Sequence, residues 1–496
     1  MDILWLFLIP LLTGLACCLP QDSKGIGRIQ IVGMSVLLLA GGNVIQKIMA
    51  SGTLHFAGNW FYLDALSGLM ILLICILSFV ASIYASGYMV NEVEERLENL
   101  WKLKGFYGLL NLFLLTMLIV VTTNSLGLLW IGIEATTLVS AFLVGYYNKQ
   151  STVEAAWKYI ILCTVGIVFA LIGIILTYTA VTQAGGEKAL GLNWDYLVTI
   201  AHRLNPNLMK TAFIFILVGY GTKAGLAPMH TWLPDAHSEA PTPVSALLSG
   251  VLLKCALYGI LRFTILTNLT AAKDVPQTMF IVFGVLSLII AAGFILVQRN
   301  IKRLLAYSSL EHMGIIFLGL GFGTPLAVFG ALFHIINHGL TKALMFFSAG
   351  NLALKYQNKK MNHIQGAFQL MPLSAGALLV GGLALAGLPP FSLFISEFYI
   401  LYGGLKAHYW LASGLFVLFL LIIFGALIYH FVRMVIGPAP IPGIASRVIP
   451  KGELYFSGTA ALAIPFILVF VLAWWIPSPL LYLLNESVRM ITGGSV

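Results

Sequence analysis

The chain has 496 residues, of which 59% are hydrophobic and only 9% are charged, and its formal net charge is +9. Soluble domains carry charges at roughly 25% of their positions, so this composition excludes a water-soluble fold. The basic residues stand at the ends of apolar runs and not in a patch interleaved with aromatic residues, which argues against a nucleic-acid-binding protein.

Apolar runs of about 20 residues recur along the whole chain, and each can cross the roughly 30 Å hydrocarbon core as a helix. The first run begins with Asp2 and has no basic leader, so we expect a retained span and not a cleaved signal. We predict an all-α polytopic membrane protein with about fourteen transmembrane helices. They lie near residues 2–20, 28–49, 63–90, 106–123, 125–146, 153–180, 211–236, 243–268, 278–297, 301–321, 325–354, 372–402, 411–436 and 457–484.

Basic residues are concentrated in the loops that follow odd-numbered spans. They are Lys24, Arg28, Arg96, Lys102, Lys104, Lys149, Arg299, Lys302, Arg303, Lys355, Lys359, Lys360, Arg447 and Lys451. Loops after even-numbered spans are poor in basic residues, apart from the longer segment 181–210. Because basic loops stay on the cytoplasmic side, we expect a multi-pass protein of the inner (cytoplasmic) membrane with both termini facing outward.

The five cysteines lie inside apolar spans and lack CxxC spacing, so we expect them to be small core residues. They are Cys17, Cys18, Cys75, Cys163 and Cys255. Iron-sulphur clusters and structural zinc need several ligands that converge at short spacings. The glycine pairs also lack the setting of a phosphate-binding loop. We therefore expect no metal, redox centre or other cofactor in this chain.

Glycine and proline interrupt the seventh and twelfth spans, at residues 225–228 and 387–390. Lys223 precedes the first break and Glu397 follows the second. Corresponding breaks in two halves indicate inverted repeats whose unwound backbone lines a hydrated cavity, although proline also kinks single helices. The predicted units are the N-terminal spans 1–105, a first five-helix repeat 106–268, a second repeat 277–436 and the C-terminal span 437–496.

Several ionisable residues fall inside the predicted spans, where each costs at least roughly 2.5–3.5 kcal/mol at the bilayer centre. They are Glu134, Lys223, Lys254, His312, His338, Lys342 and Glu397. Such a series is typical of an ion pathway, most simply one for protons. Glu134 has no basic residue within a helical turn, so it needs a cation from another helix, and Lys223 is the natural candidate. Separating or joining the two would switch Lys223 between releasing and holding a proton, whereas a purely structural ion pair would join spans 5 and 7.

Spans 8 and 11 each carry a polar stripe with helical spacing, formed by Lys254, Tyr258 and Arg262 and by His334, His338 and Lys342. Each stripe shares one helix face and suits a hydrated proton wire. We expect Arg262 to extend its charged end to the membrane interface. His334 and His338 have HxxxH spacing without the Glu of HExxH, which argues against zinc.

Further polar residues are secondary candidates. Lys158 corresponds to Lys342 at a five-span offset, and Glu311 precedes His312. The segment that follows the first break contains His230, Asp235, His237 and Glu239 and forms either an ion intake or a structural corner.

Lys223 and the segment 228–250 (Pro-Met-His-Thr-Trp-Leu-Pro-Asp-Ala-His-Ser-Glu-Ala-Pro-Thr-Pro-Val-Ser-Ala-Leu-Leu-Ser-Gly) resemble a long and specific family signature. This is the signature of the antiporter-like subunits of respiratory complex I, multisubunit sodium/proton antiporters and membrane-bound hydrogenases. Segments 133–144, 155–163, 307–314 and 337–343 look most like hydrogenase-4 component F. The resemblance covers nearly the whole chain and implies fourteen helices with two inverted five-helix repeats.

The resemblance implies a proton-translocating subunit of a formate hydrogenlyase or hydrogenase-4 type complex, without a redox centre of its own. Its partners would be other membrane subunits and, through them, nickel-iron and iron-sulphur subunits. Glu134 and Lys223 would be the coupling pair and Lys254 the bridging residue, while Glu397 would end the channel where other members carry Lys. His312, His338 and Lys342 would belong to the central axis. A sodium/proton antiporter subunit, a complex I pumping subunit and a non-transporting scaffold are the alternatives.

Overall fold

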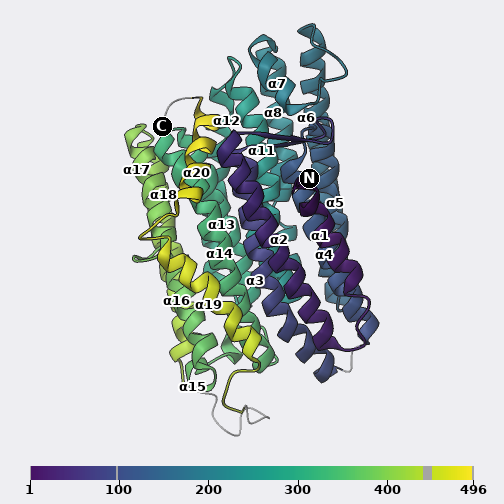
Figure 1. The fold of residues 1–496 in the computed structure, drawn as a ribbon. Coiled ribbons are helices and arrows are strands. Elements are labelled where there is room, and N and C mark those ends of the chain that lie inside the picture. Colours follow the sequence, from purple (N-terminus) through teal and green to yellow (C-terminus); the bar gives the residue numbers. More distant parts are fainter. Residues whose placement is uncertain (1, 97–98, 439–449, 494–496) are drawn as a thin grey trace.

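A computed structural model describes residues 2–96, 99–438 and 450–493 as a bundle of helices (Figure 1). The helices are α1 (Asp2–Ala16), α2 (Ser23–Ser51), α3 (Ala65–Arg96), α4 (Leu100–Thr122), α5 (Leu126–Val144), α6 (Gln150–Gln183), α7 (Trp194–Ile200), α8 (Pro206–Ala224), α9 (Trp232–Glu239), α10 (Thr242–Leu247), α11 (Leu253–Asn268), α12 (Asp274–Val297), α13 (Ile301–Phe322), α14 (Pro325–Lys355), α15 (Ala367–Leu370), α16 (Pro372–Leu385), α17 (Ser392–Lys406), α18 (Trp410–Ile436), α19 (Phe456–Val471) and α20 (Ser478–Thr492). Short turns η1 (Ala201–Arg203), η2 (Leu248–Leu252) and η3 (Met361–His363) and an antiparallel hairpin of β1 (Leu54–Phe56) and β2 (Phe61–Leu63) complete the described chain.

The predicted spans agree with these elements. Nine helical segments of the described chain are long and apolar enough to cross a membrane. The other five predicted spans coincide with α1, with α14, or with the consecutive pairs α8–α9, α16–α17 and α19–α20. The all-α polytopic fold is therefore confirmed. The predicted basic position Arg447 lies outside the described residues.

Both predicted helix breaks are present. Helix α8 ends at Ala224 and is followed by Gly225, whose φ of 76° lies in the left-handed region that favours glycine. Helix α16 ends at Leu385, and Gly387 has a φ of 69°. A third break, between α19 and α20, was not predicted. It lies just before Pro477, which cannot donate a backbone hydrogen bond.

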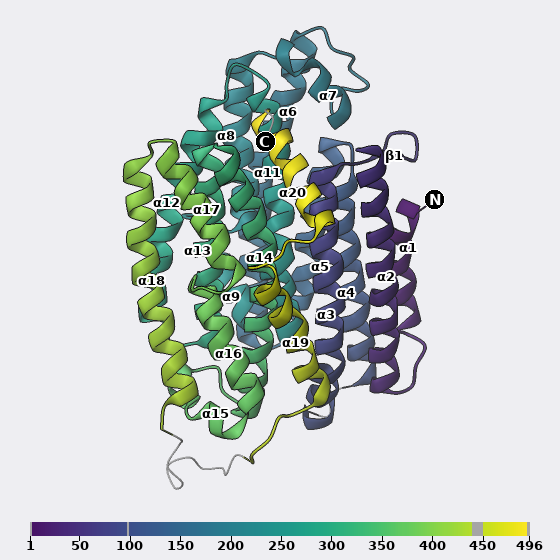
Figure 2. The same ribbon diagram turned by 60° about the vertical axis from the view of Figure 1, so that its left-hand side comes forward.

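Helix α14 lies in the middle of the bundle in both ribbon views (Figures 1 and 2). In Figure 1, α5 and α6 form one edge, and α17 and α18 form the opposite edge. The outward side chains of these edge helices are apolar, as lipid or a membrane partner requires: Phe142 on α5 is 69% exposed and Leu421 on α18 is 64% exposed. The described residues of α11 and α13 are buried almost throughout. The interior around α14 is therefore the place where polar side chains are shielded from lipid.

Four of the five cysteines are buried as expected, but Cys18 is exposed near the end of the first span, so its predicted core position is wrong.

Candidate functional site

Lys223 lies at the C-terminal end of α8, next to the first helix break, and is 1% exposed. Its Nζ donates a hydrogen bond of 2.7 Å to Thr137 Oγ1 on α5 and another to the Tyr159 hydroxyl on α6. Nζ also lies 4.5 Å from the centroid of the Tyr159 ring, within cation–π range. Hydroxyl and aromatic groups therefore replace water around this buried amine.

Glu134 lies on α5 one helical turn before Thr137, and its Oε1 accepts a hydrogen bond of 2.7 Å from Thr164 on α6. Glu134 Oε2 is buried without a hydrogen-bond partner among the described residues. Within the described chain, Glu134 and Lys223 form no ion pair. The two residues instead contact the same pair of helices. Lys223 donates to Thr137 on α5 and Tyr159 on α6, whereas Glu134 lies on α5 and accepts from Thr164 on α6.

Lys254 begins a second polar group at the start of α11 and is fully buried. Its Nζ donates to the Ser249 carbonyl over 2.5 Å and lies 2.7 Å from Nδ1 of His338 on α14. Ser249 belongs to η2, a π-type turn that widens the helix just before Lys254. No hydrogen bond in the described chain joins this group to Lys223, so the polar residues form two separate segments.

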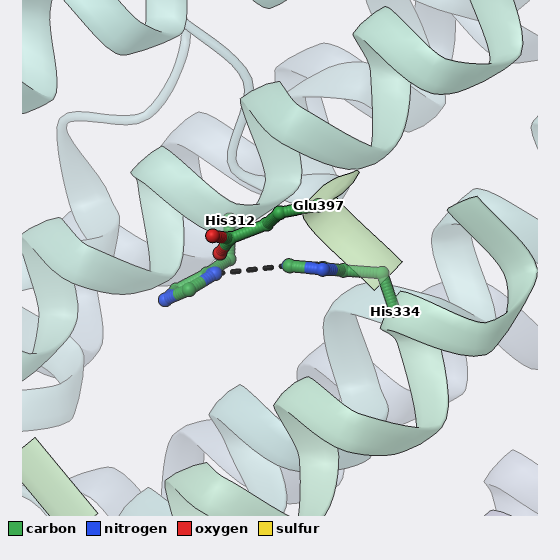
Figure 3. Close-up of side chains that lie close together, drawn as sticks. All are labelled: His312, His334 and Glu397. Atoms are coloured by element: carbon green, nitrogen blue, oxygen red, sulfur yellow. Dashed lines mark hydrogen bonds between the residues drawn. The ribbon is translucent and has the colours of Figure 1, made fainter. Parts of the chain in front are cut away.

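From His338 the second segment continues across the bundle. His312 Nδ1 on α13 lies 2.9 Å from His334 Nε2 on α14 (Figure 3). His334 Nδ1 lies 2.9 Å from Ser396 Oγ on α17. The next residue along α17 is Glu397. The segment therefore runs from Lys254 to Ser396 through helices α11, α14, α13 and α17, and a Glu397 carboxylate oxygen lies within 4.8 Å of ring nitrogens of His312 and His334.

The hydrogen-bond network assigns a direction to this segment, which we call the row and which runs from Lys254 through His338, His312 and His334 to Ser396. Ser396 donates its single hydroxyl hydrogen to the Leu393 carbonyl over 2.8 Å, so it must accept from Nδ1–H of His334. A neutral His334 then has a lone pair on Nε2, which accepts from Nδ1–H of His312. At the other end, a Lys254 ammonium donates to His338 and leaves the hydrogen of that ring on Nε2. All these donors point from Lys254 toward Ser396.

One gap interrupts the row, between His338 and His312. Their ring centroids are 4.7 Å apart, and Nε2 of each ring is buried without a hydrogen-bond partner among the described residues. The assigned tautomers place a hydrogen on one of these atoms and a lone pair on the other. Transfer across the gap would therefore run in the same direction as the rest of the row.

Glu397 lies at the far end of the row and is 6% exposed. Its carboxylate is held against Gly387 in the second helix break, where a Cβ atom would overlap Oε2. Oε1 has no hydrogen-bond partner in the described chain. The residue also lines a groove of about 230 Å³ whose walls are aromatic and aliphatic side chains of α17 and α18. Glu397 is thus close both to the histidines and to a lateral surface of the bundle.

Lys342 lies one helical turn beyond His338 on α14, and no hydrogen bond in the described chain joins it to the row. Its Nζ donates to the Leu305 carbonyl over 2.7 Å and to the Ser308 hydroxyl, both on α13. Glu311, on the same helix, is buried, and its Oε2 has no hydrogen-bond partner within the described chain.

Three of the secondary candidates, Lys158, Asp235 and Glu239, form ion pairs near the surface of the bundle. Asp235 accepts from Arg303 over 2.6 Å and pairs with the half-exposed Lys158 over 3.4 Å, so these residues join α9 to α13 and α6 at the surface. Glu239 pairs with Lys359 over 3.6 Å and lines a polar cavity of about 830 Å³ at the end of α14.

The two histidines that follow the first break are both buried. His230 lies with its ring centroid 6.3 Å from that of Tyr307. His237 is stacked against Trp232 and Phe346, and neither of its ring nitrogens has a hydrogen-bond partner among the described residues.

Arg262 does not reach the interface, so that prediction is wrong. Its guanidinium is 3% exposed and donates to both carboxylate oxygens of Asp64, over 2.5 and 2.9 Å, just before α3. It also lies 4.6 Å from the Trp194 ring centroid. The buried Asp64 carboxylate pairs with the charge that would otherwise extend to the interface.

The sequence reasoning missed the hydroxyl groups that contact the buried ionisable residues. They are Thr137, Tyr159, Thr164, Ser308 and Ser396. The available signal was a set of hydroxyl residues inside apolar spans, at positions where they face the ionisable residues of neighbouring helices.

Residues 123–423 match the family described as the NADH:quinone oxidoreductase/Mrp antiporter transmembrane region, and residues 49–96 match the N-terminus of complex I chain 5. The chain is 38% identical to the hydrogenase-4 component F homolog of Methylacidiphilum infernorum, over 85% of this chain and 86% of that protein. It is 31% identical to NADH-quinone oxidoreductase subunit N of Desulforudis audaxviator, over 86% of this chain and 82% of that protein. A chain of the archaeal membrane-bound sulfane sulfur reductase has the same fold, with a TM-score of 0.85 and 24% identity, covering 99% of this chain and 97% of that chain.

Proposed function

Because this chain belongs to the NADH:quinone oxidoreductase/Mrp antiporter family of transmembrane subunits, we propose that it translocates protons as the antiporter-like subunit of an energy-converting membrane complex. The observation that carries the proposal is the directional row from Lys254 through His338, His312 and His334 to Ser396. Each member of this row accepts or releases a proton, and together they cross the interior between helices that exclude lipid.

In the proposed mechanism, electron transfer in partner subunits drives a rearrangement that changes the separation of Glu134 and Lys223. Lys223 has no carboxylate in contact with it, so no ion pair stabilises its charged form. A proton released by Lys223 then moves toward Lys254. The row then conveys it through His338 and His312 to His334, and Glu397, whose carboxylate lies within 4.8 Å of ring nitrogens of His312 and His334, takes it up. Glu239, which lines the large polar cavity, would supply protons.

The similarity to hydrogenase-4 components favours a complex that contains nickel-iron and iron-sulphur subunits. Membrane subunits of multisubunit assemblies are the partners that the relatives share. We place the chain in the inner membrane with both termini outward, because the loops after odd-numbered spans hold the basic residues.

The test uses the intact complex in proteoliposomes, with a pH-sensitive dye inside, in sodium-free buffer. Lys254→Met should lower proton translocation at least roughly tenfold, a change of about 1.4 kcal/mol, because it removes the donor to His338. Lys188→Met, in an exposed loop, is the matched control and should translocate normally. A scaffold would keep proton translocation in the assembled Lys254→Met complex, and that result would refute the proposal.

A further inference from the structure

Three side chains that can act as metal ligands, from three helices, converge at the far end of the row. They are His312 on α13, His334 on α14 and Glu397 on α17, and the ligand atoms that each offers lie within 4.8 Å of one another (Figure 3). All three residues are buried. Two imidazole nitrogens and a carboxylate oxygen form a ligand set that suits zinc and related borderline divalent cations.

His334 is already oriented as a metal ligand. Its Nδ1–H donates to Ser396 Oγ, so its Nε2 lone pair faces His312. A hydrogen bond from the second ring nitrogen to an outer acceptor is the usual arrangement that fixes the tautomer of a metal-binding histidine. Ser396 is itself held by its hydrogen bond to the Leu393 carbonyl.

His312 becomes a ligand by moving one proton within its own ring. In the row its hydrogen lies on Nδ1, between the two imidazoles. Its Nε2 is buried and has no hydrogen-bond partner among the described residues, so it can receive that hydrogen. The ring stays neutral and exposes the Nδ1 lone pair.

Two spacings must change before an ion fits. The two facing nitrogens are 2.9 Å apart, whereas ligands at 2.0–2.1 Å in a tetrahedral zinc site lie roughly 3.4 Å from each other. The two nitrogens must therefore separate by about half an ångström, and the carboxylate oxygen, which lies within 4.8 Å of them, must reach the same spacing. Oε1 of Glu397, which has no hydrogen-bond partner in the described chain, supplies the third ligand, and water can supply the fourth.

We propose that His312, His334 and Glu397 bind Zn²⁺, and that the bound ion blocks the row by replacing the proton shared by the two imidazoles. The HxxxH pair seen in the sequence is a different set. Among the described residues, His338 lies outside the group whose ligand atoms converge.

Binding is tested with Co²⁺, whose visible absorption reports the ligand geometry, added to the purified intact complex and then displaced by Zn²⁺. Wild type should develop the bands of a low-coordinate nitrogen and oxygen site and lose them with Zn²⁺. Ser396→Ala removes only the outer acceptor and should weaken binding roughly 10- to 100-fold, and His334→Gln should weaken it further. His338→Gln is the matched control and should bind as wild type does.

Absence of these bands in wild type, or equal affinity in wild type and His334→Gln, would overturn the proposal. If His334→Gln fails to assemble, Glu397→Gln takes its place with the same expectation. In proteoliposomes, Zn²⁺ should inhibit proton translocation over the concentration range in which it displaces Co²⁺. The binding measurement needs no transport, so it remains decisive even if the proposed function fails.

Discussion

At the scale of single residues, the buried lysines differ from the buried arginine in the partners they contact. Lys223, Lys254 and Lys342 donate to hydroxyls, carbonyls or an imidazole, whereas Arg262 is held by the Asp64 carboxylate. A carboxylate in contact fixes a cation in its charged form, whereas neutral acceptors leave it free to lose a proton. The first set therefore suits transfer and the Arg262 pair suits stability.

Breaking the Arg262 pair should destabilise the protein. Arg262→Met leaves Asp64 as an unpaired buried charge, which costs about 3–5 kcal/mol. Thermal unfolding can be followed in the purified complex with a fluorogenic maleimide that reacts with the buried Cys75, Cys163 and Cys255 as they become accessible. The double variant Arg262→Met/Asp64→Leu should recover part of the lost melting temperature. No recovery in the double variant would contradict the ion-pair explanation.

The residue partners show where sequence reasoning stops. The candidates Lys254, His312, His338 and Glu397 were predicted because ionisable residues are conspicuous in apolar spans. The contact of His312 with His334 was not predicted, because helical spacing relates residues of one helix and says nothing of how two helices face each other. The same limit explains why Glu134 and Lys223 were expected as a pair but contact different hydroxyls.

At the scale of helices, the breaks place the functional side chains. Lys223 is in the last turn before Gly225, and Glu397 is held against Gly387. These two breaks were predicted because Gly-Leu-x-Pro interrupts each span. The break before Pro477 was missed because an apolar run continues on both sides. The π turn at η2 contains Gly250 but lacks the Gly-Leu-x-Pro pattern.

Gly387→Ala tests the second break. Alanine at a φ of 69° costs roughly 1–2 kcal/mol, and its Cβ would displace the Glu397 carboxylate. We expect slower proton translocation in proteoliposomes, together with a lower melting temperature. Gly376→Ala, within the preceding helix α16, is the control, since its added Cβ would have its nearest neighbour 3.9 Å away. Full translocation by an assembled Gly387→Ala complex would show that the position of Glu397 does not matter.

At the scale of the whole molecule, the positions of the spans were predictable from the apolar runs along the sequence, because each run forms one helix or two consecutive helices. The division into two repeats at 106–268 and 277–436 stays a prediction. So does the orientation in the membrane.

Orientation can be measured with single cysteines in a Cys18→Ala background, since Cys18 is exposed. Lys188→Cys follows span 6 and Lys360→Cys follows span 11, and both positions are exposed. With both termini outward, a membrane-impermeant maleimide should label the first in intact cells and the second only after permeabilisation. The reverse labelling pattern would place the termini inside.

Ser396 has only one hydroxyl hydrogen, and that hydrogen already points to Leu393. Once a proton has hopped down the chain of imidazoles, every ring is left in its opposite tautomer and cannot accept a second proton from the same side. The imidazole rings and the hydroxyl group must return to their starting orientations before the next proton can pass. Only one charge can therefore cross this part of the interior before its side chains reorient.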